Sequence, residues 1–261
     1  MVLNEVRAKY VLGLTATPER QDGHQKIIFM AAGPIRHKVK STTEDKFEQQ
    51  VIVHRLYDDP PRQLVNSEDR PKISDAYRWI MENDERTRRI IADVLACIQQ
   101  SKHPIVLTER REHAETINAM LLEKEVDSVV LKGAMRASER NAVKEQLPTA
   151  QVVVATGKYV GEGFDLPRLD TLFLAMPIAW KGSLAQYAGR IHRESDGKDR
   201  VTIYDYVDCS LPMLQRMFNK REKSYKAMGY QIFFNGETPG RSQLSTKFLL
   251  ASDKQGSEAP A

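Results

Sequence analysis

The sequence predicts an α/β protein in which helices cover both faces of a parallel sheet. Short apolar runs rich in β-branched residues alternate along the chain with amphipathic stretches of about 10–17 residues. Each amphipathic stretch has a single apolar face, as a helix has when it covers one side of a sheet. Such a series implies parallel strands joined by right-handed crossovers, with ligands bound beyond the carboxyl ends of the strands.

The expected strands are short and apolar, because a strand buried on both faces has no polar side. In chain order they are residues 10–14, 51–56, 104–107, 128–131, 152–155, 171–174 and 201–206. Each is bounded by polar residues, Gly or Pro, which separate it from the next amphipathic stretch.

The expected helices are identified by the spacing of their apolar residues. They are a short apolar helix around residues 25–32, residues 84–100, residues 111–124, a helix that begins near Gly182, and residues 211–228. In residues 84–100, Ile90, Val94 and Ile98 share one face, and the next helix repeats this spacing. The last helix has apolar residues on one side and basic residues on another, which is typical of a helix with a solvated face.

Composition divides the chain into three parts. Residues 1–33 hold one expected strand, a Thr-Ala-Thr-Pro loop and a short helix, which is too little to bury a core, so we interpret them as the end of another domain. Residues 34–235 hold the alternating series, within which the proline-punctuated residues 58–71 predict a surface loop. Residues 236–261 are expected to form a flexible tail.

The overall composition is that of a globular protein. Of the 261 residues, 41% are hydrophobic and 28% are charged, which excludes collagen-like, disulfide-framework and wholly disordered chains. The net charge of +4 is compatible with a polyanionic partner but does not identify one. The longest apolar run, residues 171–180, is about half of what a membrane helix needs, so we expect a soluble, cytoplasmic protein with no membrane partner. Cys97 and Cys209 are expected to be packed thiols.

The most informative stretch is Gln186-Tyr187-Ala188-Gly189-Arg190-Ile191-His192-Arg193. Arg190 and Arg193 are three residues apart, so we expect them on one helical face, converging on one anion. A guanidinium suits phosphate because it stays charged and can donate to two oxygens. We expect Gly189 to let a neighbouring backbone approach closely. The alternative interpretation is a solvated basic face, which is the ordinary fate of exposed arginine.

Three stretches, in order, resemble motifs of the superfamily 2 helicases and translocases. Gln186, Gly189, Arg190 and Arg193 match the sixth motif, Q-x-x-G-R-x-x-R. Residues 155–165 resemble the fifth motif, in which a strand ends in Ala-Thr and a Gly-x-Asp follows, with one residue more than the commoner spacing. The Thr-Ala-Thr-Pro of residues 15–18 resembles the third motif of the branch related to type III restriction enzymes and the XPB-type repair translocase. Each motif lies at a strand end or a helix start, as the resemblance requires.

The resemblance implies an ATP-dependent motor in which ATP lies between two RecA-like lobes. Residues 34–235 would be the second, carboxyl-terminal lobe, and residues 1–33 the end of the first. The implied catalytic residues, arginine fingers on the γ-phosphate, are Arg190 and Arg193. The implied nucleotide-binding residues are Gln186, Gly163 and Asp165. The implied contacts to the nucleic-acid backbone are Thr156, Thr108 and Arg140. For the two threonines, the alternative is that they cap helices. The residues implied to couple the two sites are Thr15 and Thr17.

Two motifs of such motors are absent from the sequence. The phosphate loop, G-x-x-x-x-G-K-[ST], and the acidic box for magnesium belong to the first lobe. Residues 84–87, Asp-Glu-Arg-Thr, imitate that box in letters but open a polar helix, so we expect no metal ligands in this chain. ATP is the expected cofactor, with Mg²⁺ held by the missing first lobe, and the chain alone should not hydrolyse ATP.

The expected partners are that first lobe and a nucleic acid. The form of the third motif favours DNA. The alternative is a non-catalytic nucleic-acid-binding or regulatory module that keeps the fold. A nucleotide-binding enzyme that uses the loop of Gly161 and Gly163 is disfavoured, because the third glycine of G-x-G-x-x-G is missing.

Overall fold

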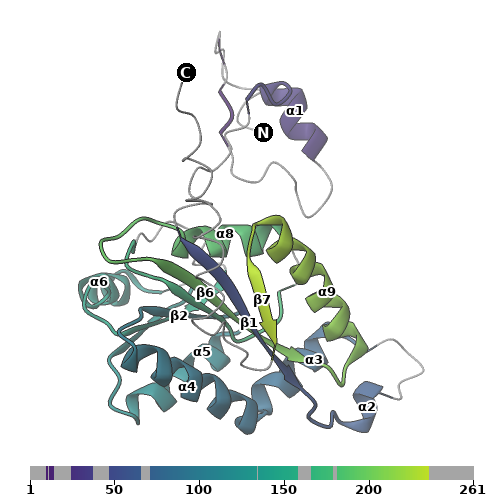
Figure 1. Cartoon of the computed structure of the whole chain (residues 1–261), viewed down its shortest axis with the longest axis vertical. Coiled ribbons are helices and arrows are strands. Elements are labelled where there is room, and N and C mark those ends of the chain that lie inside the picture. Colours follow the sequence, from purple (N-terminus) through teal and green to yellow (C-terminus); the bar gives the residue numbers. More distant parts are fainter. Residues whose placement is uncertain are drawn as a thin grey trace, which may run out of the picture.

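A parallel seven-stranded sheet forms the centre of the molecule (Figure 1). The structure is a computed structural model and describes residues 10, 12–14, 25–37, 47–65, 71–133, 135–157, 166–178 and 181–234. Within these ranges the strand order is β3-β4-β2-β5-β6-β1-β7. The strands are β1 (Glu48–Leu56), β2 (Pro104–Thr108), β3 (Ser128–Leu131), β4 (Val152–Thr156), β5 (Thr171–Leu174), β6 (Arg200–Asp208) and β7 (Gln231–Phe234).

Helices cover both faces of this sheet, which confirms the predicted RecA-like α/β class. The described helices are α1 (Gln25–Ala32), α2 (Arg62–Val65), α3 (Ile73–Glu82), α4 (Asp84–Gln99), α5 (Arg111–Leu122), α6 (Ala137–Gln146), α8 (Lys181–Ile191) and α9 (Pro212–Ala227). Apolar residues of α4 and α5 pack on one face. Those of α6, α8 and α9 pack on the other. In Figure 1, α1 stands apart from the sheet.

Alternation along the central strands divides the core into these two layers. Ile105 and Leu107 of β2 join the α8 and α9 layer, whereas Val106 between them joins the α4 and α5 layer. Each of these three residues is at most 1% exposed. Because both faces are buried, β2, β4 and β5 are apolar except for threonines, and these threonines lie at the strand ends.

Most sequence-based expectations for the sheet are confirmed. The strands expected at residues 128–131 and 171–174 have the predicted bounds, and the other four expected between residues 51 and 206 differ by one to three residues at an end. The short helix at residues 25–32 also has its predicted bounds. The edge strand β7 and helix α3 were not anticipated, because the four residues of β7 resemble the start of a polar tail and α3 follows a proline-rich stretch.

Two expectations were wrong. Residues 10–14 were expected to form a strand, but Tyr10 and residues 12–14 have no strand structure, and Tyr10 and Leu14 are more than 80% exposed. None of the described strands lies beside them, so their backbone has no ladder to join. Residues 58–71 were expected to be a loop, but they include the short helix α2, whose Leu64 packs against α3 and α9. Residues 236–261 lie outside the described part of the chain.

In the described part of the chain, every helix is too short or too polar to cross a membrane.

Candidate functional site

Helix α8 carries the sequence motif that matters most, and it presents that motif away from the core. Its Leu184, Tyr187, Ala188 and Ile191 are buried against the sheet. Gln186 is exposed on the other side. Because Gln186 and Arg190 are four residues apart in one helix, they lie on the same face. The buried face holds the helix in place while a polar face remains available.

The two motif arginines are both half-buried, but only one is helical. Arg190 lies in the last turn of α8, whereas Arg193 follows the end of the helix at Ile191. The expectation that both share one helical face was therefore wrong, because the chain leaves the helix between them. The expectation for Gly189 was also wrong, since a Cβ placed there would have no atom within 4 Å. The surface over Gly189 is open space, and Arg190 lies beside it.

The carboxyl end of α8 is fixed by Lys198. Its ammonium donates to the carbonyl oxygens of Arg193 (2.8 Å), Leu169 (2.5 Å) and Pro167 (3.0 Å). Burial lowers the pKa of Lys198 to about 8, although the negative charge of Asp170 opposes this. This lysine ties the end of the motif helix to the loop that precedes β5.

His192, between the two arginines in sequence, belongs to the core side. Its Nε2 lies 2.6 Å from the hydroxyl of Tyr230, and its ring packs edge-on against Phe47. Burial, and secondarily the charge of Lys198, lower the pKa of His192 to about 4, so the ring is neutral at pH 7. These contacts give His192 a packing role.

Two of the predicted nucleic-acid contacts lie next to each other at the carboxyl edge of the sheet. Thr108 ends β2, Thr156 ends β4, and the two are register partners in the parallel ladder. Both are buried, with Thr108 1% and Thr156 6% exposed. The Thr108 hydroxyl lies 3.0 Å from Nδ1 of His113 and accepts from the backbone N–H of Arg110 at 3.4 Å. Burial lowers the pKa of His113 to about 3, so the neutral ring is the partner of Thr108.

The capping alternative for these threonines does not describe Thr108. The residue that caps α5 is Arg110, and no side chain makes the capping hydrogen bond. Thr108 instead forms a local turn with the Arg110 backbone and holds His113. The hydroxyl of Thr108 is thus committed within the protein.

Gly157 brings the ends of β2 and β4 close to α8. A Cβ at this position would lie 2.6 Å from the Tyr187 hydroxyl and 2.7 Å from Oε1 of Glu109. Only glycine leaves room for this approach without a shift of one neighbour. The end of β2, the end of β4 and helix α8, which are far apart in the sequence, therefore meet at one point.

The remaining predicted residues are less closely grouped. Arg140 is exposed in the first turn of α6, beyond the end of β3, and its Nη2 donates to the carbonyl oxygen of Met135 at 3.4 Å. The other four predicted site residues lie outside the described part of the chain; they are Thr15, Thr17, Gly163 and Asp165. Among the described residues, no three His, Cys, Asp or Glu side chains gather as a metal site would require.

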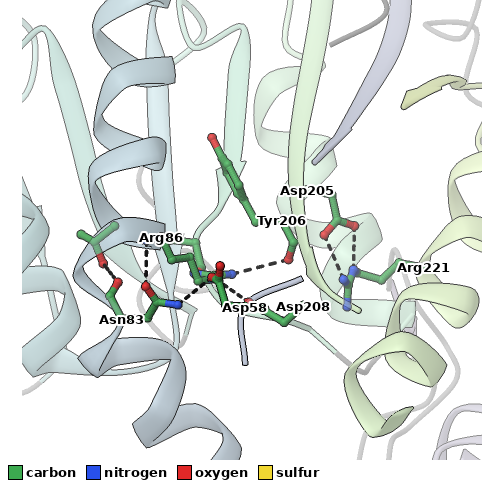
Figure 2. A network of polar contacts seen from close by, with 9 residues as sticks. Asp58, Asn83, Arg86, Asp205, Tyr206, Asp208 and Arg221 are labelled. Carbon is green, nitrogen blue, oxygen red and sulfur yellow. Dashed lines mark hydrogen bonds and ion pairs between the residues drawn. The ribbon is translucent and has the colours of Figure 1, made fainter. Parts of the chain in front are cut away.

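Two buried arginines, which were not predicted as site residues, pair with aspartates of β6 (Figure 2) and also donate to carbonyl groups of the chain that follows β5. Arg86 of α4 is bound to Asp208 of β6 through Nε at 3.1 Å, and its Nη1 donates to the carbonyl oxygen of Ala175 at 2.6 Å. Arg221 of α9 makes two parallel hydrogen bonds to Asp205, of 2.8 and 2.9 Å. The two arginines approach β6 from opposite faces, since Asp205 and Asp208 are an odd number of residues apart in the strand.

The two ion pairs differ in how burial and the partner's charge shift the pKa of their members. Burial raises the pKa of Asp208, although the Arg86 charge opposes this, and its Oδ2 is buried without a hydrogen-bond partner among the described residues. Arg221 has its pKa raised by Asp205 and by the Tyr225 hydroxyl, which outweigh burial. The sequence signal for both arginines was present, because each occupies an apolar-face position of its helix, as do the buried Ile90 in α4 and Phe218 in α9.

Comparisons with known proteins identify a conserved domain in the part of the chain that contains α8. Residues 86–195 match the helicase conserved C-terminal domain. The chain is 23% identical over 263 residues to a protein of Acanthamoeba polyphaga mimivirus named as an ATP-dependent RNA helicase, covering 97% of this chain and 48% of that protein. It is 38% identical over 85 residues to protein 108L of Invertebrate iridescent virus 3, covering 33% of this chain and 77% of that protein. The crystal structure of T4 UvsW superposes with a TM-score of 0.57 at 17% identity, over 74% of this chain and 42% of that one.

The fold and the sixth-motif helix define the class of protein as a RecA-like carboxyl-terminal lobe of a helicase-type motor. Residues 86–195 of the chain carry the helicase conserved C-terminal domain, and the chain is similar to helicases of viral origin. It spans about half the length of the mimivirus relative.

Proposed function

We propose that this chain is the second motor lobe of an ATP-dependent helicase or translocase that acts on a nucleic acid, most readily DNA. The observation that carries the proposal is the placement of α8. One face of the helix is buried, while Gln186 and Arg190 occupy the opposite face beside the open surface at Gly189. A first lobe that closes on this surface would bring ATP to the arginines only in the closed state, which links hydrolysis to lobe movement.

In this proposal Arg190 and Arg193 stabilise the charge that develops on the γ-phosphate. ATP supplies the phosphoryl group that is transferred to water. The donors fit that anion, because guanidinium groups stay charged and can donate two parallel hydrogen bonds to phosphate oxygens. Gln186 adds an amide on the same face. Gly163 and Asp165 are proposed near the nucleotide on the resemblance of the fifth motif alone.

The proposed nucleic-acid track follows the carboxyl edge of the sheet. A motor must move along any sequence, so it contacts phosphates rather than base edges. Thr156 at the end of β4 and the exposed Arg140 on α6 are the proposed contacts. Thr108 lies beside Thr156, but its hydroxyl would have to leave His113 to reach a phosphate. Thr15 and Thr17 are proposed to couple this track to the nucleotide.

The division of the chain follows the same proposal. Residues 34–235 form the second lobe, residues 1–33 end the first lobe, and the exposed Tyr10, Leu12 and Leu14 are apolar residues that the rest of the first lobe would cover. We propose that the first lobe also supplies the Mg²⁺ ligands, and that residues 236–261 form a flexible tail.

The test is ATP turnover, with and without nucleic acid, in a protein that carries both lobes. Arg190→Ala and Arg193→Ala should each lower turnover by about 10³-fold or more while nucleotide binding is retained. This chain without a first lobe should show no turnover. Unchanged turnover in both variants would place the arginines on a solvated basic face and would favour the non-catalytic binding module.

A second measurement separates DNA from RNA. Stimulation of turnover is compared for single-stranded and duplex forms of each nucleic acid at one salt concentration, because phosphate contacts are strongly salt-dependent. The restriction-like third motif supports DNA, whereas the mimivirus relative is named as an RNA helicase. Stimulation by RNA alone would overturn the DNA assignment and leave the motor assignment in place.

A further inference from the structure

The chain that follows β5 is buried backbone outside a regular strand, although the Ala175 N–H still donates to the Leu107 carbonyl of β2 at 2.9 Å. We call residues 175–178 the β5–α8 segment. All four residues are buried, with Ala175 and Met176 at most 1% exposed. Pro177 cannot donate a backbone hydrogen bond, and the strand ends at Leu174. Buried carbonyl groups of such a segment need partners from elsewhere in the protein.

Side chains from three different helices supply those partners. Nη1 of Arg86 on α4 donates to the Ala175 carbonyl at 2.6 Å. The Tyr77 hydroxyl on α3 donates to the Pro177 carbonyl at 2.9 Å. Nη1 of Arg221 on α9 donates to the Ile178 carbonyl at 3.0 Å.

We infer that Tyr77, together with Arg86 and Arg221, is a positioning residue that sets where α8 begins and therefore where Arg190 lies. Each of the three side chains donates to a carbonyl group of the backbone that leads toward α8. They act through the backbone that enters α8, while Lys198 fixes the other end through the Arg193 carbonyl. The consequence for ATP hydrolysis rests on the proposed function, whereas the consequence for the backbone does not.

Of the three positioning residues, Tyr77 is the one whose substitution tests the inference best. Arg86 and Arg221 are also held by buried aspartates, so their removal disturbs the core. Tyr77 is half-buried, and its ring lies 5.9 Å from the guanidinium of Arg110, just past the end of β2. Burial, and secondarily the charge of Glu109, raise the pKa of Tyr77, so the hydroxyl stays protonated as a donor. Tyr77 therefore stands between the end of β2, on the proposed nucleic-acid track, and the entry to α8.

The first test needs no ATP and uses this chain. Tyr77→Phe removes one hydroxyl and keeps the ring. The matched control is Tyr206→Phe, whose hydroxyl donates to Asp93 at 2.6 Å, away from the β5–α8 segment, while its backbone carbonyl remains for Arg86. Hydrogen exchange of the α8 amides should be about fivefold faster in Tyr77→Phe and unchanged in the control, since one hydrogen bond is lost.

The outcome that overturns the inference is equal exchange in α8 for both variants, or a rise spread evenly over all elements. Should Tyr77→Phe prove globally less stable than the control, Arg221→Lys is the second variant, because it keeps a cation beside Asp205 but removes the donor to Ile178. Faster exchange confined to α8 in that variant supports the inference, and its absence rejects it.

The second test uses a protein with both lobes. Tyr77→Phe should lower kcat for ATP hydrolysis by about 10-fold with little change in KM, because a displaced arginine acts on the transition state rather than on binding. Tyr206→Phe should leave both constants unchanged. If Arg190→Ala abolishes turnover but Tyr77→Phe does not affect it, the positioning role is wrong and the motor assignment stands. If Arg190→Ala has no effect, the proposed function fails, and the exchange experiment still decides whether Tyr77 positions α8.

Discussion

Two pairs of arginines near the same half of the sheet lie in contrasting environments. Arg86 and Arg221 are 1% and 3% exposed, and each is paired with a buried aspartate. Arg190 and Arg193 are half-buried on or just after α8, beside open surface. The first pair is committed to the fold, and the second pair faces a region where a ligand or another domain can approach.

The difference shows that burial, rather than residue type, decides what an arginine does. A buried guanidinium is compensated by one fixed carboxylate, and removal of either member leaves an unpaired charge in the core. An arginine that is only half-buried keeps contact with solvent, so its removal leaves no fully buried unpaired charge, and its guanidinium suits phosphate. Substitution of Arg86 or Arg221 should therefore lower mainly the stability of the fold. Substitution of Arg190 or Arg193 should lower mainly ATP turnover.

The largest effect on stability is expected for Arg221→Met. The change leaves Asp205 buried with only the Tyr225 hydroxyl as a side-chain donor, so the free energy of unfolding should fall by about 3–5 kcal/mol. Arg190→Met should lower it by clearly less than Arg221→Met, because Arg190 is only half-buried, whereas Arg221 is paired with the buried Asp205. Urea denaturation of the full chain measures both values.

A double variant separates charge from packing in this prediction. Arg221→Met with Asp205→Leu removes both charges and should recover part of the lost stability. If the double variant is as unstable as the sum of the single variants, or if Arg190→Met costs as much as Arg221→Met, the contrast between the two pairs is wrong.

The contrast between the motif arginines and the buried arginines also explains which site residues could be predicted from the sequence. Gln186, Gly189, Arg190 and Arg193 form a contiguous motif, so a single stretch of sequence identified them. Core strands such as residues 171–174 were also predictable, because a strand buried on both faces is apolar throughout.

The buried network was not predicted, because its members are far apart in sequence. Arg86 lies 122 residues from Asp208 and 89 from Ala175. Periodicity places Arg86 on the apolar face of α4, which indicates burial but not the partner. The meeting of Gly157 with Glu109 and Tyr187 likewise depends on strand order, which local pattern does not specify.

A second prediction concerns the pH dependence of stability and His192, which lies between Arg190 and Arg193 in the sequence. Its pKa is about 4 in the folded chain and about 6.5 when exposed, so the unfolded state takes up the proton first as the pH falls. Stability should therefore fall between about pH 6.5 and pH 4, by about 3 kcal/mol at most from this residue.

His113 contributes a similar loss that continues to about pH 3, so the wild-type profile alone does not isolate His192. The informative quantity is the difference in unfolding free energy between the wild type and His192→Gln at pH 7, 5.5 and 4. That difference should shift in favour of the variant as the pH falls. Parallel profiles would show that His192 is not buried as a neutral ring.

A third prediction compares two glycines, Gly157 in tightly packed surroundings and Gly189 beside open space. Gly157→Ala places a methyl group 2.6 Å from the Tyr187 hydroxyl, and overpacking should cost about 1–3 kcal/mol. Gly189→Ala meets no atom within 4 Å and improves helix propensity, so it should stabilise the chain by about 0.5–1 kcal/mol.

Thermal or urea unfolding of both variants tests this pair. Tyr187→Phe should relieve part of the cost of Gly157→Ala, because it removes the nearest atom. In a protein with both lobes, Gly189→Ala should lower ATP turnover despite the gain in stability, if a first lobe closes on that surface. Equal effects of the two substitutions on stability would contradict the described difference in their surroundings.

The smallest effect is expected at Arg88, two residues after Arg86 in the same helix. Its side chain is 61% exposed and lies 3.4 Å from Glu85 and 3.8 Å from Asp84. Exposed pairs of this spacing contribute little and are screened by salt, so Arg88→Ala should cost less than about 0.5 kcal/mol, and less still in 1 M salt. Urea denaturation at two salt concentrations measures this, with Arg86→Ala as the comparison. Because the two arginines share a helix turn but only Arg86 is buried against Asp208, a large cost at Arg88 would mean that charge at the start of α4, and not burial, governs how arginine contributes to this fold.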